Sequence, residues 1–222
     1  MADAVYPPQA PDPEAEERGR LLFASACRFV AGAADEKAIP PDLLPEIAFA
    51  GRSNVGKSSL VNALVGHAAL ARVSKSPGRT RQINFFELGQ RLMLVDLPGY
   101  GYAQAPKREI ARWTSLVERY FKGRTGLRRA LLLFDARFGI KETDAPLMRF
   151  LDEAAVSYQA VLTKADLVKP AELATMLAGL AAALARHPAA HPMIHITSAR
   201  DGSGIAALRA ALAALAAATA PR

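Results

Sequence analysis

The sequence predicts an α/β fold, a three-layer α/β/α sandwich around a six-stranded, mostly parallel sheet with one antiparallel edge strand. The chain has 222 residues, 51% of them hydrophobic, which is enough for one domain with a buried core. From Glu46 onward, strand-like runs alternate with segments of helical periodicity, as in sheets whose strands are joined by helices. Several runs, such as Leu92-Met93-Leu94-Val95, are continuously apolar, which is typical of strands covered by helices on both faces.

The expected elements follow one another in a regular order. Strands are expected at 46–50, 82–88, 91–96, 129–136, 158–163 and 193–197. Helices are expected at 57–66, 107–122, 144–156, 171–186 and 204–218. Only Gly89-Gln90 separates the second strand from the third, and so short a connection makes a hairpin. One edge of the sheet should therefore be antiparallel.

The chain before Glu46 has a different composition. Residues 1–20 carry five acidic and two basic side chains, and four prolines lie within the first 13 residues. We therefore expect 1–45 to be a flexible acidic N-terminus plus a short helical extension, with the helix at 14–32 and a proline-containing linker after it. The main domain is expected at 46–218, with its Ala-rich last helix packed on the sheet, and 219–222 form a tail.

Composition also limits the compartment. No apolar run is long enough to span a membrane, no signal peptide is visible, and Cys27 is the only cysteine. A cytoplasmic protein with no membrane insertion is therefore expected. Cys27 lies in an apolar helical run and is expected in the core. His187, His191 and His195 are four residues apart, but a proline follows two of them, so no metal site is expected there.

The positive charge of the chain is concentrated in one segment. The formal net charge is +7, and residues 107–129 hold eight basic side chains against two acidic ones. A basic patch of this kind can dock on a polyanion such as RNA, although a solvated basic face is an equally good interpretation.

The strongest motif of the chain is a phosphate-binding loop. The pattern G-x-x-x-x-G-K-[ST] matches Gly51, Arg52, Ser53, Asn54, Val55, Gly56, Lys57 and Ser58. Glycines let successive backbone N–H groups point at phosphate oxygens, and the helix that follows adds its positive N-terminal end. Lys57 can reach the β- and γ-phosphates, and the Ser58 hydroxyl can bind Mg²⁺.

A second motif lies at the end of the strand expected at 91–96. It consists of Asp96, Leu97, Pro98 and Gly99. An Asp at this position can hold magnesium through a water molecule, and the Gly99 N–H can contact a γ-phosphate. The D-x-x-G pattern is common, so its weight comes from its place downstream of the phosphate loop.

Two further motifs follow later strands and concern the base. Thr163, Lys164, Ala165 and Asp166 resemble the [NT]-K-x-D motif of GTPases. The Asp166 carboxylate can accept two hydrogen bonds from guanine, for which adenine has no matching donors. The Lys164 stem can cover the base plane. Thr197, Ser198 and Ala199 can bring a backbone N–H close to the guanine O6.

A switch loop is expected between the first helix of the domain and the hairpin. It must supply a side chain that senses the γ-phosphate through Mg²⁺. We favour Thr80 for this role, while Ser74, Ser76 and a simple loop without a sensing residue remain alternatives.

Together these residues resemble a known family. The stretch from Leu44 to Leu60 (LPEIAFAGRSNVGKSSL), Pro77-Gly-Arg-Thr-Arg-Gln82, Asp96-Leu-Pro-Gly-Tyr-Gly-Tyr102 and Thr163-Lys-Ala-Asp166 look like the EngB family of bacterial GTPases, also called YihA or YsxC. The similarity covers about residues 20–215. It implies a Ras-like P-loop GTPase domain, a role in assembling the large ribosomal subunit, and a need for the protein in normal division septation.

The resemblance also assigns residues to roles. It places nucleotide contacts on the phosphate loop, on Gly78, Arg79, Thr80, Arg81 and Gln82, on the D-x-x-G residues, and on the two base motifs. It assigns magnesium to Ser58 and Thr80, to which the D-x-x-G motif adds Asp96. Catalytic roles fall to Lys57, Thr80 and Gly99. The expected partners are a guanine nucleotide and large-subunit particles with their rRNA, but no DNA, and we expect a monomer.

The mechanism has one open point. Many GTPases place a glutamine after the D-x-x-G glycine to orient water, but here the residue is Tyr100. We expect slow intrinsic hydrolysis, raised either by the ribosomal particle or by a potassium ion bound near Asn54, because G-x-x-N-x-G-K-S resembles the loop of potassium-stimulated GTPases. Equal turnover in KCl and NaCl would remove the potassium hypothesis. The competing interpretations are an RNA-binding scaffold that holds nucleotide without significant turnover, and an ATP-dependent kinase or ATPase, against which Asp166 argues.

Overall fold

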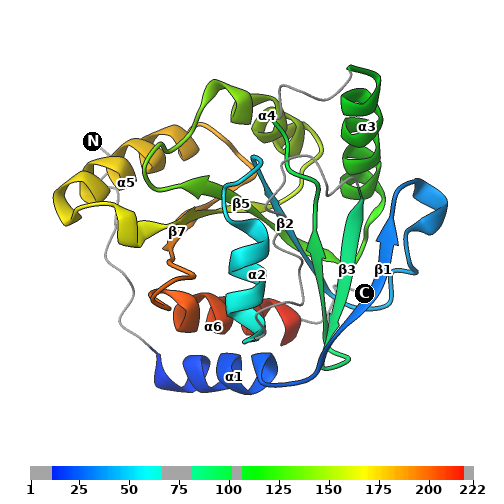
Figure 1. Cartoon of the computed structure of the whole chain (residues 1–222), viewed down its shortest axis with the longest axis horizontal. Helices are drawn as coiled ribbons and strands as arrows, with labels where there is room; N and C mark the ends of the chain where they lie inside the picture. The colour runs from blue at the N-terminus through cyan, green and yellow to red at the C-terminus, as the bar shows by residue number, and fades with distance from the viewer. Residues whose placement is uncertain (1–11, 67–81, 102–106, 218–222) are drawn as a thin grey trace.

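A computed structural model describes residues 12–66, 82–101 and 107–217 of the chain (Figure 1). The strands are β1 (Cys27–Ala33), β2 (Glu46–Gly51), β3 (Ile83–Leu88), β4 (Leu92–Asp96), β5 (Leu127–Asp135), β6 (Tyr158–Thr163) and β7 (Ala190–Ile196). The helices are α1 (Pro13–Phe23), α2 (Lys57–Val65), α3 (Lys107–Gly123), α4 (Ala145–Glu153), α5 (Pro170–Leu184) and α6 (Ile205–Ala217), with short 3₁₀ turns η1 (Glu36–Ala38), η2 (Glu142–Asp144) and η3 (Ala165–Leu167).

The strands form one sheet in the order β1-β3-β4-β2-β5-β6-β7. Helices α3, α4 and α5 cover one face, where Tyr120, Met148 and Leu180 join one apolar cluster. Helices α1, α2 and α6 cover the other face and bury Leu22, Leu60 and Leu208 in a second cluster (Figure 1). The three-layer sandwich and the Ras-like fold predicted from the sequence are therefore confirmed.

The composition of the sheet differs from the prediction. Within the described residues it has seven strands rather than six, and β3 is antiparallel to both of its neighbours, β1 and β4. The antiparallel strand is thus inside the sheet, and β1 forms the edge. The turn between β3 and β4 has positive φ at Gly89 and Gln90, and Arg91 adds a third residue to the connection.

The extra strand comes from a segment expected to be helical. The helix predicted at 14–32 ends at Phe23, and Cys27–Ala33 pairs with β3 instead, so the prediction is wrong beyond that point. The aromatic side chains of Phe29 and Phe86 face each other in this pairing, with ring centroids 5.7 Å apart. Such cross-strand aromatic pairs stabilise sheets, and here tertiary pairing overrides the helical spacing of the apolar residues. Cys27 is half-buried in this strand, and burial raises its pKa to about 11, which leaves the thiol inert near neutral pH.

Helix α1 begins with a local signal and ends in a close contact. The Asp12 side chain accepts hydrogen bonds from the N–H groups of Glu14 and Ala15, at 3.0 and 3.2 Å, and Pro13 occupies the first turn. The helix then crosses α6 so closely that a Cβ on Gly19 would lie 2.6 Å from the backbone nitrogen of Ala210. The N-terminal helix is therefore packed directly on the domain.

The other expected elements are observed with ends shifted by a few residues. No helix in the described part of the chain is long and apolar enough to cross a membrane. The flexible N-terminal residues 1–11 and the tail 219–222 of the sequence prediction lie outside the described residues.

A buried ionic cluster closes the end of the sheet at which β2 begins. The Glu46 carboxylate is paired with the Arg124 guanidinium and accepts a hydrogen bond of 2.9 Å from the Tyr120 hydroxyl. Glu46 is 1% exposed, and Arg124 also donates to the Pro40 carbonyl at 2.8 Å. The cluster therefore joins β2, the end of α3 and the segment before β2.

His195 in β7 should make the stability of the fold depend on pH. Its side chain is 8% exposed, and burial, with smaller contributions from His191 and Arg129, lowers its pKa to about 4. The unfolded chain takes up this proton near pH 6.5, so the stability contributed by His195 is complete above that pH and is lost as the pH falls toward 4. We expect a loss of about 3 kcal/mol from this side chain.

The measurement is urea unfolding of the wild type and His195→Gln between pH 7 and 4. The variant should lose less stability than the wild type over this window. Equal slopes of unfolding free energy against pH would contradict the assignment.

Candidate functional site

The phosphate loop connects the carboxyl end of β2 to α2. Asn54 has a φ of 63° and Gly56 a φ of 109°, so the chain turns sharply just before the helix. Gly56 is the N-cap of α2 and has no side chain to close the helix end, which leaves the N-terminal N–H groups available to an anion. Lys57 is buried at the start of the helix, and its ammonium donates to the Gly51 carbonyl at 3.3 Å.

A carboxylate faces this loop from the end of β4. Asp96 is 3% exposed, and burial raises its pKa to about 6 although Lys57 and Ser58 oppose the shift. The Ser58 hydroxyl lies 3.5 Å from Asp96 Oδ2, and no group in the described part of the chain donates a hydrogen bond to the buried Asp96 Oδ1. A hydroxyl beside an unsatisfied carboxylate oxygen is a donor set that fits Mg²⁺.

The residues after Asp96 lie against the phosphate loop. The Leu97 N–H donates to the Phe49 carbonyl at 3.0 Å, and Ser53 N–H donates to the Tyr100 carbonyl at the same distance. A Cβ on Gly99 would lie 3.0 Å from Ser53 N and 3.1 Å from Lys57 Nζ. Any larger residue at this position would press on the loop backbone, so the D-x-x-G motif lies directly against the phosphate loop.

Tyr100 has partners that the sequence did not indicate. Its hydroxyl donates to Asp144 Oδ1 at 2.9 Å, and Arg52 Nε lies 3.4 Å from the same oxygen. Asp144 is completely buried in η2, before α4. Burial and the neighbouring Asp144 carboxylate raise the pKa of Tyr100 far above its usual value, so the hydroxyl remains a donor.

The base motifs meet in a pocket of about 310 Å³ beside α2. Its lining includes Gly56, Lys164, Asp166 and Ala199. The Asp166 side chain is 14% exposed, and Ser198 Oγ donates to its Oδ1 at 2.8 Å. The carboxylate is therefore held in place with acceptor capacity left for a ligand.

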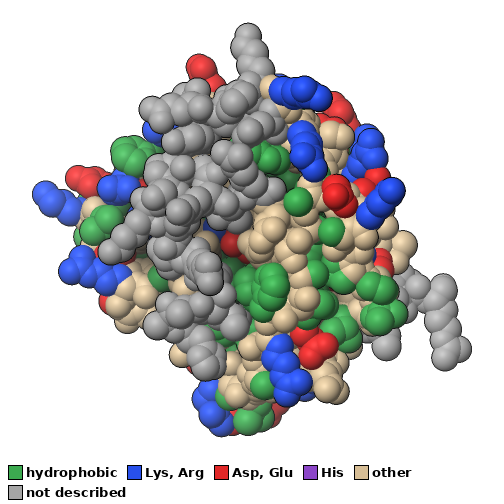
Figure 2. Space-filling model, turned by 45° about the vertical axis from the view of Figure 1, so that its right-hand side comes forward, with side chains coloured by type: hydrophobic (Ala, Val, Ile, Leu, Met, Phe, Trp, Pro, Cys, Tyr) green, Lys and Arg blue, Asp and Glu red, His purple; other side chains and the backbone are tan. Residues whose placement is uncertain are grey.

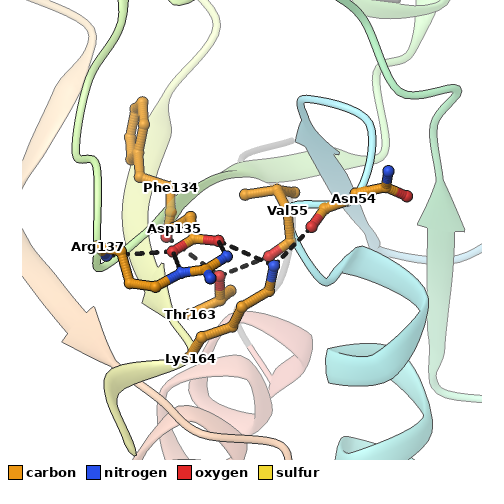
Figure 3. A network of polar contacts seen from close by, with 7 residues as sticks. All are labelled: Asn54, Val55, Phe134, Asp135, Arg137, Thr163 and Lys164. Carbon is orange, nitrogen blue, oxygen red and sulfur yellow. Dashed lines mark hydrogen bonds and ion pairs between the residues drawn. The ribbon is translucent and has the colours of Figure 1, made fainter. Parts of the chain in front are cut away.

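Lys164 spans the distance between this pocket and the phosphate loop (Figure 3). It has a φ of 58°, and its ammonium donates to the Asn54 carbonyl at 2.7 Å and to Asp135 Oδ2 at 2.8 Å. Asp135 in turn accepts from both the side chain and the backbone of Arg137, and these bonds lower its pKa despite its burial. The Thr163 hydroxyl lies 2.6 Å from the Val55 carbonyl oxygen. The base motif is thus joined to the phosphate loop directly, and Asp135 at the end of β5 holds Lys164 in this position.

Some predicted site residues are placed elsewhere or not described. Gly78, Arg79, Thr80 and Arg81, together with the alternatives Ser74 and Ser76, lie outside the described residues. Gln82 precedes β3, where its side-chain amide donates to Asn84 Oδ1 at 3.2 Å and lies against Gly32 of β1. All other predicted positions lie at or just after the carboxyl ends of β2, β4, β6 and β7, with Lys57 and Ser58 in the first turn of α2. Sequence reasoning missed Asp135 and Asp144 because neither belongs to a motif.

The basic side chains of the segment 107–129 do not all lie on an open surface, so the patch expected from the sequence is smaller than its charge count suggests. Arg124 is buried in the ionic cluster with Glu46, and Arg129 is half-buried and donates to Gln159 at 3.0 Å. Arg119 is paired with Glu36. Exposed basic side chains that remain on α3 include Arg108, Arg112 and Lys122. Figure 2 shows Lys and Arg side chains interspersed with acidic and apolar ones on this side of the molecule.

Comparison with known proteins identifies the family. Residues 46–164 match the model of a family described as "50S ribosome-binding GTPase". A "Probable GTP-binding protein EngB" of Rhodospirillum rubrum is 54% identical over 205 residues, which cover 90% of this chain and 89% of that protein. That of Granulibacter bethesdensis is 55% identical over 205 residues and 92% of both chains.

A solved structure agrees with these relatives. The crystal structure of a probable GTP-binding protein engB superposes with a TM-score of 0.62 at 26% identity, covering 77% of this chain and 98% of that one. With the phosphate loop, the D-x-x-G motif and the base pocket at one edge of the sheet, the chain therefore belongs to the EngB family of GTP-binding proteins, and it is a GTPase.

Proposed function

We propose that this GTPase is a magnesium-dependent switch in the assembly of the large ribosomal subunit, whose contacts with rRNA depend on the bound nucleotide. One observation carries the nucleotide part of the proposal. Lys57, Ser58 and the unsatisfied Asp96 oxygen lie together at the start of α2, and Gly56, the residue before Lys57, lines the pocket that also contains Asp166. A phosphate site that adjoins a base pocket suits a single guanine nucleotide.

Each residue has a defined part in the reaction. Ser58 and Asp96 would hold Mg²⁺, which would neutralise charge on the phosphates and leave the chemistry to positioning. Lys57 and the N–H groups at the start of α2 bind the phosphate oxygens, and the Gly99 N–H faces the γ-phosphate. Thr80 is proposed as a further magnesium contact.

The intrinsic rate of hydrolysis should be low. Tyr100 takes the position of the water-orienting glutamine, and its hydroxyl donates to Asp144. An external group must therefore order the attacking water, either the ribosomal particle or a potassium ion near the exposed Asn54. We also propose that the protein acts as a cytoplasmic monomer and is needed for septation, as the family resemblance implies.

The ribosomal part of the proposal rests on the family description and on the exposed basic side chains of α3. It is tested by sedimentation with large-subunit particles in the presence of GDP or a non-hydrolysable GTP analogue. Arg108→Gln with Lys122→Gln should weaken binding and reduce its salt dependence. The matched control is Arg186→Gln with Lys169→Gln, two exposed basic residues at the ends of α5.

Turnover separates a GTPase switch from a scaffold that merely holds nucleotide. We expect particles to accelerate hydrolysis and to bind more tightly with the GTP analogue than with GDP. Equal affinity in both nucleotide states, with no acceleration, would favour the scaffold.

A further inference from the structure

The contacts of Asp144 concern the nucleotide state of the site, although Asp144 belongs to no nucleotide motif. The carboxylate is completely buried, so it must be satisfied by its neighbours. Its Oδ1 receives the Tyr100 hydroxyl at 2.9 Å and lies 3.4 Å from Arg52 Nε, while its Oδ2 accepts the Lys141 N–H at 2.7 Å. One carboxylate thus contacts both the phosphate loop and the residue after the D-x-x-G motif.

The backbone connects the same two segments. Arg52 and Tyr100 form a parallel bridge, in which Ser53 N–H donates to the Tyr100 carbonyl at 3.0 Å and Tyr100 N–H donates to the Gly51 carbonyl at 3.4 Å. Gly99 and Tyr100 are therefore docked on the phosphate loop by main-chain bonds, and the Asp144 contacts hold the Tyr100 side chain in the same arrangement.

The docked segment restricts the space beside Lys57. A single added carbon atom on Gly99 would approach Lys57 Nζ to 3.1 Å and Ser53 N to 3.0 Å. A γ-phosphate that contacts both this ammonium and the Gly99 N–H would have to lie between them, which would require Gly99 and Tyr100 to move away from Ser53. A nucleoside diphosphate can also reach Lys57 through its β-phosphate, but it has no phosphate to place beside Gly99.

We propose that Asp144 is a positioning residue that stabilises the docked Gly99 and Tyr100 and thereby favours GDP over GTP. The inference deepens the proposed nucleotide site and rests on it. A contact present in only one of two states shifts the equilibrium between them by its own differential free energy. Tyr100 therefore does not replace the missing glutamine. Its hydrogen bond to Asp144 instead holds the segment after the D-x-x-G motif against the phosphate loop.

The test measures the affinity of GDP and of GppNHp, both with Mg²⁺, for the wild type, Tyr100→Phe and Asp144→Asn. Tyr100→Phe removes only the hydroxyl, and Asp144→Asn keeps the shape of the side chain. We expect both variants to bind GppNHp more tightly relative to GDP than the wild type does. The Kd for GppNHp divided by the Kd for GDP should fall about tenfold, as for loss of one hydrogen bond to a charged group. The double variant should show the same ratio as Tyr100→Phe, because Asp144 acts on the switch through the Tyr100 hydroxyl, which Tyr100→Phe already removes.

Tyr120→Phe is the matched control. It removes a Tyr-to-carboxylate hydrogen bond of the same 2.9 Å length, to Glu46, at the other end of the sheet. If the change in Tyr100→Phe came only from lower stability, Tyr120→Phe should show it as well. We expect the Kd ratio of Tyr120→Phe to equal that of the wild type instead. Trp113, the only tryptophan of the chain, lines a pocket of about 470 Å³ together with Tyr100, so its fluorescence gives a second readout of undocking.

Each outcome has a distinct meaning. Failure of the wild type to bind guanine nucleotides would overturn the proposed site and this inference with it. Wild-type binding with an unchanged ratio in Tyr100→Phe and Asp144→Asn, or a ratio that rises, would overturn the role of Asp144 alone.

Discussion

Asp166→Asn should exchange the base preference of the protein from guanine to xanthine. The Asp166 carboxylate offers only acceptors, which match the two adjacent donors of guanine at N1 and at the exocyclic amine. An asparagine amide offers one acceptor and one donor instead, which match the N1–H and the C2 carbonyl of xanthine. Its NH₂ would face a guanine donor, so we expect GDP binding to weaken by about 3 kcal/mol, or more than 100-fold.

The measurement is competition of GDP, xanthosine diphosphate and ADP against a fluorescent guanine nucleotide. Asp201→Asn is a suitable control, because this exposed carboxylate in the neighbouring turn accepts from the Ser203 N–H and does not line the pocket. Its affinities should match those of the wild type. If the wild type bound ADP as tightly as GDP, or if Asp166→Asn retained its preference for GDP, Asp166 would not be the base-reading residue.

Breaking the Glu46–Arg124 pair should cost far more stability than breaking an exposed ion pair of the same protein. Removing one partner of a buried ion pair leaves an uncompensated charge in the interior, which destabilises proteins by about 3–5 kcal/mol. We expect Arg124→Met to lower the free energy of unfolding by at least about 3 kcal/mol, because the Glu46 carboxylate would then keep only the Tyr120 hydroxyl as a strong side-chain donor.

Urea unfolding of Arg124→Met, Glu46→Leu and the double variant measures this effect. The double variant should recover much of the loss, because two apolar side chains leave no buried charge. Arg119→Ala provides a contrast, since its pair with Glu36 has both side chains more than 60% exposed and should contribute almost nothing. Similar losses for Arg119→Ala and Arg124→Met would refute the explanation by burial.

Much of the nucleotide site could be predicted because its motifs follow strands. The carboxyl ends of parallel strands meet at one edge of a sheet, so Gly51, Asp96, Thr163 and Thr197 had to converge once their strands were assigned. Their order along the chain and the chemistry of each side chain were sufficient to expect a guanine nucleotide.

Other features depended on tertiary contacts that leave no local pattern. The residues of β1 neither alternate strictly between buried and exposed nor form a continuous buried run, because the neighbouring Phe29 and Val30 are both exposed. The spacing of the apolar residues in 22–33 also fits a helix. Arg124 counted as surface charge in the sequence because its partner Glu46 lies 78 residues away.

Asp135 and Asp144 illustrate the same limit within the site. Each acts on a motif residue from an element with no motif of its own, and Asp144 contacts Tyr100 across 44 residues. Such supporting residues are found only when the fold brings the partners together.

The close crossing of α1 and α6 has a consequence for synthesis of the protein. Leu22 and Phe23 of α1 belong to the same apolar cluster as Leu208 and Leu212 of α6, which lie close to the opposite end of the sequence. A nascent chain emerges from its N-terminal end, so this face of the sheet stays only partly covered until α6 has left the exit tunnel. The packing of α1 is therefore completed only after α6 has been synthesised, so the apolar face of α1 is made long before its partner helix.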